Sequence, residues 1–143
     1  MKIAVLVKQV PDSETRINLK EPVPKLDDAG FTRVLNPYDA FAVEEAVRIK
    51  EKNPGTEVTA VTLGAERVKE TLKKDCLAVG CDKAVLVCDP ACADLDEAGV
   101  AAVLAAALRQ ESYDLILCGK QAIDDDAAQV GVRVAEKIGR AHV

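Results

Sequence analysis

Short apolar runs alternate along the chain with longer stretches in which apolar residues recur at helical spacing. The runs KIAVLVK, EVTAVTL, KAVLVC and YDLILCG predict strands at 2–8, 57–63, 83–88 and 113–119. The longer stretches predict helices at about 38–52, 66–79, 96–111 and 127–138. Such alternation is typical of parallel strands joined by crossover helices, and nearly continuous apolar strands are typical of strands covered on both faces.

This order of elements predicts a three-layer α/β sheet of the Rossmann type. If the first strand is central and the chain changes direction between the third and fourth strands, the strand order is 3-2-1-4. The carboxyl ends of the first and fourth strands then border a crevice, and open α/β sheets bind ligands at such switch points. This order would bring KQVPD (8–12) beside GKQAIDDD (119–126). The 143 residues suffice for a single domain.

The first predicted helix is amphipathic, with its charged residues on the face turned away from the core. Its apolar stripe consists of Phe41, Ala42, Val43, Ala46, Val47 and Ile49.

Residues 11–35 form an irregular insertion between the first strand and the first helix. The segment is polar, contains three prolines, and is longer than the usual connection in an α/β unit. It has two alternatives, a loop without secondary structure or a hairpin. In the hairpin, RINL (16–19) would pair with FTRVL (31–35) around a turn at 27–30.

The charge and hydropathy of the chain exclude two classes of partner. The net charge is −5 and the pI is near 5.0, with no lysine or arginine cluster of the kind that binds nucleic acid. No apolar run reaches the roughly 18 residues of a membrane span, and the apolar start of the chain is typical of a strand rather than of a signal peptide.

The five cysteines form an odd set without a CxxC motif. Cys88 and Cys118 fall inside apolar strand-like runs, so we predict buried, reduced cysteines in a cytoplasmic protein. The single histidine, His142, has no partners with which to hold a metal ion. We therefore expect no metal site.

The segment GKQAIDDDAAQVG (119–131) places three aspartates directly before a stretch of small residues typical of a helix start. Gly119 allows a turn after the fourth strand, and Asp125 or Asp126 is suited to cap a helix that begins near Ala127. The other aspartates would accept hydrogen bonds from ribose hydroxyls or an adenine amino group. The alternative is a capped surface helix with a solvated acidic loop that binds nothing.

The same helix start offers free backbone N–H groups. Those of Ala128, Gln129 and Val130 would face a phosphate, because a helix N-terminus attracts anions. Lys8 or Lys120 would add positive charge.

A second unusual helix start lies in LNPYDAFAVEEAVRIKEK (35–52). Pro37 disfavours the α region for Asn36, so Asn36 is held extended with its side-chain amide available to a base or a backbone group. The alternative is an ordinary Asn-Pro helix start without a ligand.

Four segments together carry a specific resemblance. VKQVPD (7–12), NPYDAFAVEEAVRIKE (36–51), CLAVGCDKAVLV (76–87) and DLILCGKQAIDDDAAQVG (114–131) resemble the β (small) subunit of electron transfer flavoproteins, in order along almost all of the chain.

This resemblance implies a sheet of the adenine-nucleotide α-hydrolase-like group and an electron carrier without bond-making catalytic residues. It implies a heterodimer with an α subunit that holds most of the FAD site. The pair passes electrons from flavin dehydrogenases, such as acyl-CoA dehydrogenases, to a downstream acceptor. The β subunit of this family holds AMP as a structural nucleotide or, in electron-bifurcating members, a second FAD at the same place.

Carried over by position, the resemblance assigns nucleotide contacts to segments that follow the predicted strands. The residues are Leu6, Asn36, Pro37, Tyr38, Asp39, Leu63, Gly119, Lys120, Gln121, Ala122, Ile123, Asp124, Asp125, Asp126, Ala127, Ala128, Gln129 and Val130.

Three of these positions depart from family patterns. Ala128 and Val130 replace a polar pair of many AMP-binding members, so backbone amides would hold the phosphate. Asp125 stands where bifurcating members carry glycine, which favours AMP over a second FAD.

The family continues beyond the last residues KIGRAHV with further strands, a docking loop that contains a leucine, and an arm around the α subunit. The resemblance therefore implies a chain truncated after its N-terminal nucleotide-binding portion, with a fifth strand that would begin at about His142.

Three other classes with related sheets fit the sequence less well. An ATP-hydrolysing or adenylating enzyme would carry a Gly/Ser-rich phosphate loop after the first strand, and KQVPDSET has none. A universal-stress-like ATP-binding module would carry a glycine-rich loop after the fourth strand, where the glycines are too far apart. A phosphorelay receiver needs an acidic pair after the first strand, and Asp12 stands alone there.

Overall fold

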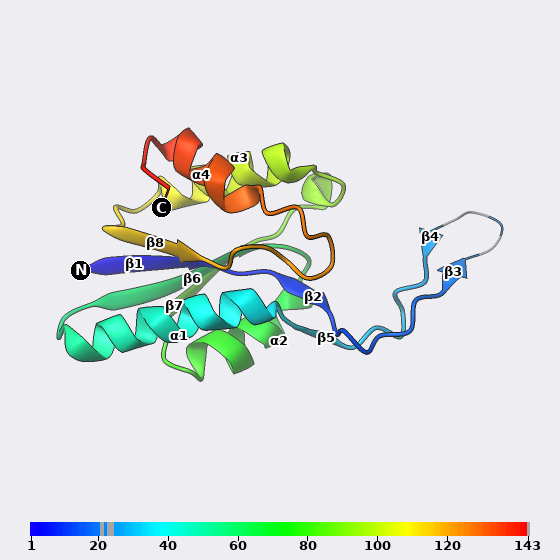
Figure 1. The fold of residues 1–143 in the computed structure, drawn as a ribbon, viewed down its shortest axis with the longest axis horizontal. Coiled ribbons are helices and arrows are strands. Elements are labelled where there is room, and N and C mark those ends of the chain that lie inside the picture. The colour runs from blue at the N-terminus through cyan, green and yellow to red at the C-terminus, as the bar shows by residue number, and fades with distance from the viewer. Residues whose placement is uncertain (21, 23–24, 143) are drawn as a thin grey trace.

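The computed structural model describes residues 1–20, 22 and 25–142, and four parallel strands form its central sheet (Figure 1). Their order is β7-β6-β1-β8, which is the predicted order 3-2-1-4 with the first strand in the interior. The strands are β1 (Lys2–Leu6), β6 (Glu57–Leu63), β7 (Lys83–Val87) and β8 (Leu115–Cys118).

Helices cover both faces of this sheet (Figure 1), which confirms the predicted three-layer α/β architecture. One face carries α1 (Pro37–Lys52) and α2 (Val68–Leu72), which continues as a π-helical turn at Lys73–Leu77. The other face carries α3 (Glu97–Leu108) and α4 (Val130–Ile138).

The apolar core accordingly has two parts. One cluster packs around Val43 of α1 and Leu72 of α2, and the other around Leu104 of α3 and Val134 of α4. The inner strands β1 and β6 contribute fully buried side chains to both clusters. The edge strands β7 and β8 are only partly covered, so the expectation of burial on both faces holds for the two inner strands.

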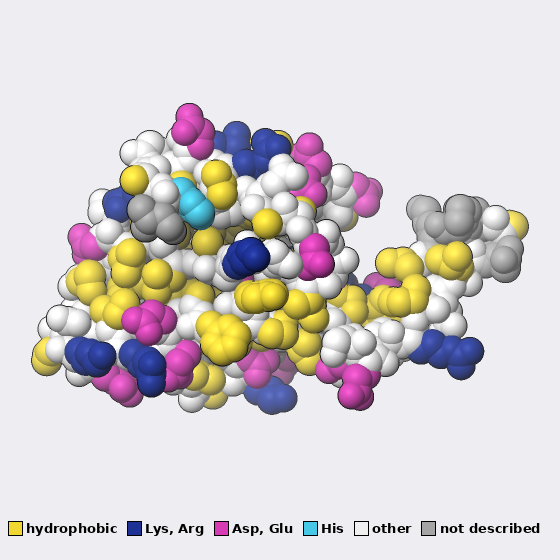
Figure 2. Space-filling model, in the orientation of Figure 1, with side chains coloured by type: hydrophobic (Ala, Val, Ile, Leu, Met, Phe, Trp, Pro, Cys, Tyr) yellow, Lys and Arg dark blue, Asp and Glu magenta, His cyan; other side chains and the backbone are white. Residues whose placement is uncertain are grey.

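The buried face of α1 differs from the prediction most clearly at Phe41, while Val47 and Ile49 are partly buried. Ala42, Val43 and Ala46 are buried against the sheet, whereas Phe41 is 73% exposed. Its assignment to the buried stripe is wrong. The buried residues Asp39, Ala42, Val43 and Ala46 recur at helical spacing and define one face, and at about 100° per residue Phe41 lies on the opposite side. Figure 2 shows exposed hydrophobic side chains gathered over this helix and along the neighbouring insertion between β1 and α1.

The insertion forms two short antiparallel ribbons. Strand β2 (Gln9–Pro11) pairs with β5 (Arg33–Leu35), and β3 (Leu19–Lys20) pairs with β4 (Lys25–Leu26) in a hairpin that projects from the body (Figure 1). The predicted pairing of RINL with FTRVL is therefore wrong.

Burial explains the different register. Val10 is fully buried and pairs with Val34, whereas Ile17 and Leu19 of RINL are exposed. Burial of one face specifies strand register, so FTRVL pairs with the segment that continues from β1. The turn near 27–30 is present between β4 and β5, where the N–H of Phe31 donates to the carbonyl of Asp28 at 3.2 Å.

All five cysteines are free. Burial raises the pKa of the Cys76 thiol to about 12 and that of the Cys81 thiol to about 11. Full burial, as predicted, holds only for these two. Cys92 and Cys118 are partly buried, and Cys88 is exposed because it follows the edge strand β7 and lies outside the sheet.

Two further expectations concern the membrane and metals. In the part of the chain that the structure describes, no helix has the length and apolar character needed to span a membrane. Within the same residues, no group of three or more His, Cys, Asp or Glu side chains could hold a metal ion. The predicted fifth strand would begin at about His142, and Val143 lies outside the described residues.

Candidate functional site

A cavity of about 710 Å³ lies at the carboxyl ends of the strands. It is bordered by the last residues of β1 and β6 and by the segments that follow β7 and β8. Strands β6 and β7 lie on one side of β1, and β8 lies on its other side. The cavity is at the ends of these strands and therefore sits at a topological switch point of the sheet. Its volume lies within the roughly 300–1,000 Å³ that is typical of small-molecule and cofactor sites.

Most of the predicted site residues line this cavity. They are Leu6, Asn36, Asp39, Leu63, Gly119, Lys120, Gln121, Ala122, Asp125, Ala127, Ala128, Gln129 and Val130. The remaining ones lie outside its lining: Pro37, Tyr38, Ile123, Asp124 and Asp126.

The two unusual helix starts meet at this cavity although their helices lie on opposite faces of the sheet. Helix α1 packs on one face and α4 on the other (Figure 1). Residues 119–129 run from the end of β8 past the start of α1 before they enter α4. We refer to residues 119–129 as the acidic loop. Through it, the first turn of α1 and the first turn of α4 border the same space.

Asn36 is extended as predicted, with φ −53° and ψ 126°, but its amide is not available to a base. The side chain is 1% exposed and holds the acidic loop. Its Nδ2 donates to the carbonyl of Gln121 at 2.9 Å, and its Oδ1 accepts from the N–H of Ile123 at 3.2 Å. The sequence predicted either a base or a backbone group as the partner of the Asn36 side chain, and in the structure the partner is the backbone of the acidic loop.

Helix α4 begins at Val130, three residues later than predicted. Asp126 and Ala128 have φ values of +52° and +54°, and this left-handed backbone cannot form part of a right-handed helix. The predicted cap by Asp125 or Asp126 is therefore wrong, and Gln129 occupies the N-cap position without a side-chain cap bond.

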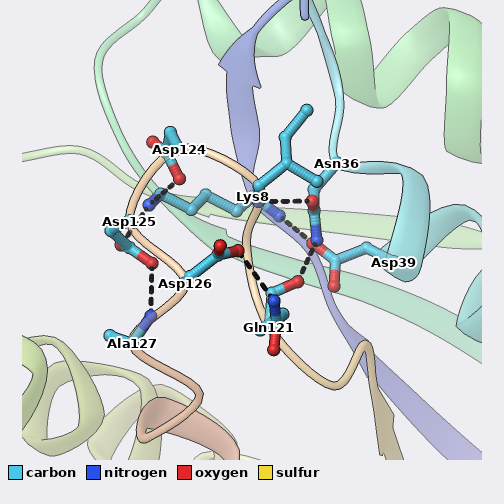
Figure 3. Close-up of polar contacts among 9 residues, drawn as sticks. Lys8, Asn36, Asp39, Gln121, Asp124, Asp125, Asp126 and Ala127 are labelled. Carbon is cyan, nitrogen blue, oxygen red and sulfur yellow. Dashed lines mark hydrogen bonds and ion pairs between the residues drawn. The ribbon is translucent and has the colours of Figure 1, made fainter.

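The aspartates of the acidic loop hold the loop itself. Asp125 Oδ1 accepts from the N–H of Ala127 at 3.1 Å, and Asp126 Oδ1 accepts from Gln121 Nε2 at 2.7 Å. Figure 3 shows both bonds between residues of the loop. The carboxylates that were expected to bind a ribose or an adenine already have partners within the protein.

Lys8 joins the turn after β1 to the acidic loop. Its Nζ donates to Asp124 Oδ1 at 2.7 Å and to Asp125 Oδ2 at 2.8 Å (Figure 3). Burial alone would lower the pKa of Lys8, but the bonds to Asp124 and Asp125 raise it above the ordinary value. Burial would likewise raise the pKa of Asp125, but the bond from Lys8 holds it below its ordinary value.

Lys8 is therefore engaged and does not offer a free charge to a phosphate. Lys120 is exposed and lines the cavity, so it is the lysine that remains available of the two that the sequence suggested.

Asp39 is the most buried carboxylate of the site, with 6% exposure. Its Oδ2 accepts from the N–H of Lys8 at 2.8 Å, and its Oδ1 accepts from the N–H of Gly119 at 3.1 Å. Burial raises the pKa of Asp39 to about 6, although both N–H groups favour the charged form.

Sequence reasoning missed the other half of the cavity wall. Two further segments line it. One is Gly64, Ala65, Arg67 and Val68 after β6, and the other is part of the stretch 88–97 after β7, which includes a 3₁₀ turn at Pro90–Cys92. The signal was present, because the carboxyl ends of parallel strands share one edge and every loop that follows them belongs to that edge. Arg67 and Glu97 bring charge to this half.

The order of the strands and the position of the cavity define a doubly wound α/β domain with a crevice at its switch point. Comparison with known proteins identifies its family: residues 25–143 match the family described as "Electron transfer flavoprotein domain", and the chain belongs to the electron transfer flavoprotein family. The members of this family are electron carriers rather than classical enzymes.

Several curated relatives are similar to almost the whole chain. The "Electron transfer flavoprotein subunit beta" of Thermoanaerobacterium thermosaccharolyticum is 44% identical over 140 residues, 96% of this chain and 52% of the relative. That of Syntrophomonas wolfei is 41% identical over 143 residues, 100% of this chain and 55% of the relative. The "Caffeyl-CoA reductase-Etf complex subunit CarD" of Acetobacterium woodii is 41% identical over 139 residues, 96% of this chain and 52% of the relative. The expected resemblance to β subunits is confirmed, and the chain spans about half the length of these relatives.

Proposed function

We propose that this chain is the nucleotide-holding portion of an electron transfer flavoprotein β subunit and that its cavity binds AMP as a structural nucleotide. One observation carries the proposal. The start of α4, the acidic loop and the ends of β1 and β6 line a single cavity at the switch point of the sheet.

The cavity offers suitable surfaces for the phosphate and for the base of an adenylate. The first N–H groups of α4 have no acceptor within the helix, so the helix start favours an anion such as a phosphate. Lys120 adds a positive charge at the same edge. Leu6 and Leu63 supply apolar contact for a base.

Gly131 allows this helix start to lie close to β8. A Cβ atom at Gly131 would stand 2.7 Å from Cys118 Sγ, which is closer than real Cβ contacts allow. A side chain at this position would force the helix start or Cys118 to shift, and Val130 and Gly131 line the cavity.

A second candidate is FAD in the same place, and the extent of the cavity favours it. The cavity continues beyond the acidic loop to Arg67 and to the segment after β7. Asp125, which the sequence set against a flavin, is held by Lys8 and by the N–H of Ala127. A bound flavin would supply one- and two-electron transfer, while the residues of this chain would hold and orient it.

Further parts of the proposal concern the whole protein, of which the relatives are about twice as long. We propose that it pairs with an FAD-holding α subunit and accepts electrons from flavin dehydrogenases, such as acyl-CoA dehydrogenases. A cytoplasmic location is proposed from the five free cysteines.

The test is direct identification of the nucleotide. The purified chain is denatured, and the released nucleotides are separated by chromatography. The stripped protein is then titrated with AMP and with FAD in a calorimeter. We expect AMP to co-purify and to bind again, because the cavity is formed in the folded chain.

A matched pair of substitutions localises the binding. Ala127→Phe places a large side chain in the cavity lining and should abolish binding. Ala102→Phe makes the same change on an exposed position of α3 and should leave binding intact. FAD in place of AMP would establish the second candidate. No binding of either nucleotide below about 1 mM would refute the proposed site.

A further inference from the structure

One carboxylate connects the two strands that border the switch point. Strands β1 and β8 end at Leu6 and Cys118, and Asp39 accepts the N–H groups of Lys8 and Gly119, which follow these ends closely. Asp39 belongs to the first turn of α1, on one face of the sheet. The edge of the sheet is thus tied together by a residue from a helix and not only by strand pairing.

The fit between Asp39 and the turn after β8 is close. A Cβ atom at Gly119 would stand 2.3 Å from Asp39 Oδ1 and 2.7 Å from the carbonyl carbon of Tyr38. Any other residue at position 119 would have to displace the carboxylate or the helix start. Gly119 is therefore required by this contact and not only by the bend of the chain.

A second buried side chain continues the connection along the acidic loop. Asn36 donates to the carbonyl of Gln121 and accepts from the N–H of Ile123. Beyond these contacts, the loop has left-handed backbone at Asp126 and Ala128. Aspartate adopts this backbone fairly readily, but for alanine it is unfavourable and needs support from the surroundings. The bonds from α1 supply such surroundings just before the loop enters α4.

We infer that Asp39 is a positioning residue: its carboxylate fixes the turn after β1 to the turn after β8 and so sets the shape of the acidic loop that presents the start of α4 to the cavity. The role assigned to it is to hold the two turns, because both of its oxygens accept backbone N–H groups and its side chain is buried. The inference rests on the proposed function for its consequence in binding. The contact itself does not depend on any ligand.

The experiment compares the wild-type chain with Asp39→Asn by amide hydrogen exchange in NMR. Asparagine has almost the same shape but one acceptor oxygen, so either the N–H of Lys8 or that of Gly119 loses its partner. We expect that N–H to exchange about tenfold faster or more. The neighbouring N–H of Val7, which donates to the carbonyl of Val61 at 3.0 Å, should keep its rate.

The same proteins are then titrated with AMP and with FAD. We expect Asp39→Asn to weaken the binding of the retained nucleotide about tenfold or more and to shift the amide resonances of the acidic loop. Glu45→Gln removes one carboxylate from the exposed face of the same helix and should change neither result. If Asp39→Asn does not fold, Gly119→Ala takes its place. The added Cβ atom would displace the Asp39 carboxylate, so we expect the same faster exchange and the same weaker binding.

Unchanged exchange of both Lys8 and Gly119 in Asp39→Asn would overturn the inference. Faster exchange with undiminished nucleotide affinity would also overturn it, because the contact would then be structural only. If the wild-type chain binds neither AMP nor FAD, the proposed function fails, and the exchange rates still decide whether Asp39 fixes the loop.

Discussion

Replacing Asp39 by asparagine should change how the stability of the domain depends on pH. The pKa of Asp39 is about 6 in the folded chain, where burial disfavours its charge, against 3.8 for an unperturbed aspartate. The folded state therefore takes up a proton at higher pH than the unfolded state does. The free energy that Asp39 contributes to folding rises as the pH falls from 7 toward 4, and it is lost as the pH rises through 6.

The size of this effect follows from the two pKa values. A difference of about two pKa units corresponds to about 3 kcal/mol between the fully protonated and the fully charged limits. Between pH 7 and pH 5, the same values give a change of about 1.3 kcal/mol. Asparagine does not titrate, so Asp39→Asn should lack this change.

The assay is urea unfolding of both proteins at pH 7, 6 and 5. Other titrating groups, such as Asp82, whose pKa is lowered by Lys50, contribute equally to both proteins and cancel. We expect the wild-type chain to gain about 1.3 kcal/mol over Asp39→Asn on acidification. A difference that is constant with pH, or that moves in the opposite direction, would refute the argument that burial controls this carboxylate.

Three further predictions concern the free energy of unfolding, measured by urea titration. Thr59→Val should raise it by about 1 kcal/mol, because the buried Thr59 hydroxyl has no hydrogen-bond partner among the described residues. Ala128→Gly should raise it by roughly 0.5–1 kcal/mol, since glycine adopts a φ of +54° without strain. Val43→Ala should lower it by about 1–3 kcal/mol, whereas Phe41→Ala should change it by less than about 0.5 kcal/mol.

Each of these predictions has a result that contradicts it. A loss of stability in Thr59→Val would mean that the hydroxyl has a partner in solution. A loss in Ala128→Gly would show that the loop backbone is not strained there. Equal costs at Phe41 and Val43 would place both side chains in the core.

The sheet could be predicted from the sequence because its inner strands are marked by continuous apolar runs. EVTAVTL matches β6 residue for residue, and KIAVLVK contains β1. The order 3-2-1-4 was expected only if the first strand is central and the chain changes direction after the third strand, and the pairing confirms it. Errors occurred where the apolar signal is weak. FTRVL could pair with RINL or with the segment that follows β1, and the burial of Val10 favours the segment after β1.

The candidate site was predictable as a set of segments but not as a set of contacts. The acidic loop could be recognised from its residues, and most of it lines the cavity. The roles of Asn36 and Asp39 could not be derived, because their partners lie 85 and 80 residues away in Gln121 and Gly119. The late start of α4 was also hidden: aspartate adopts left-handed backbone more readily than most residues, but Ala128 gives no such signal.

The ion pairs of Lys8 with Asp124 and Asp125 affect how fast a nucleotide would bind at the proposed site. Asp124, Asp125 and Asp126 carry three negative charges, and Lys8 and Lys120 carry two positive ones, so this edge of the domain has a small negative excess on a chain of net charge −5. Among the described residues at this edge, positive charge does not exceed negative charge, so a phosphate at the proposed site would be held by short-range amide contacts. Association rates should therefore stay far below the electrostatically steered regime and should not decline as ionic strength rises.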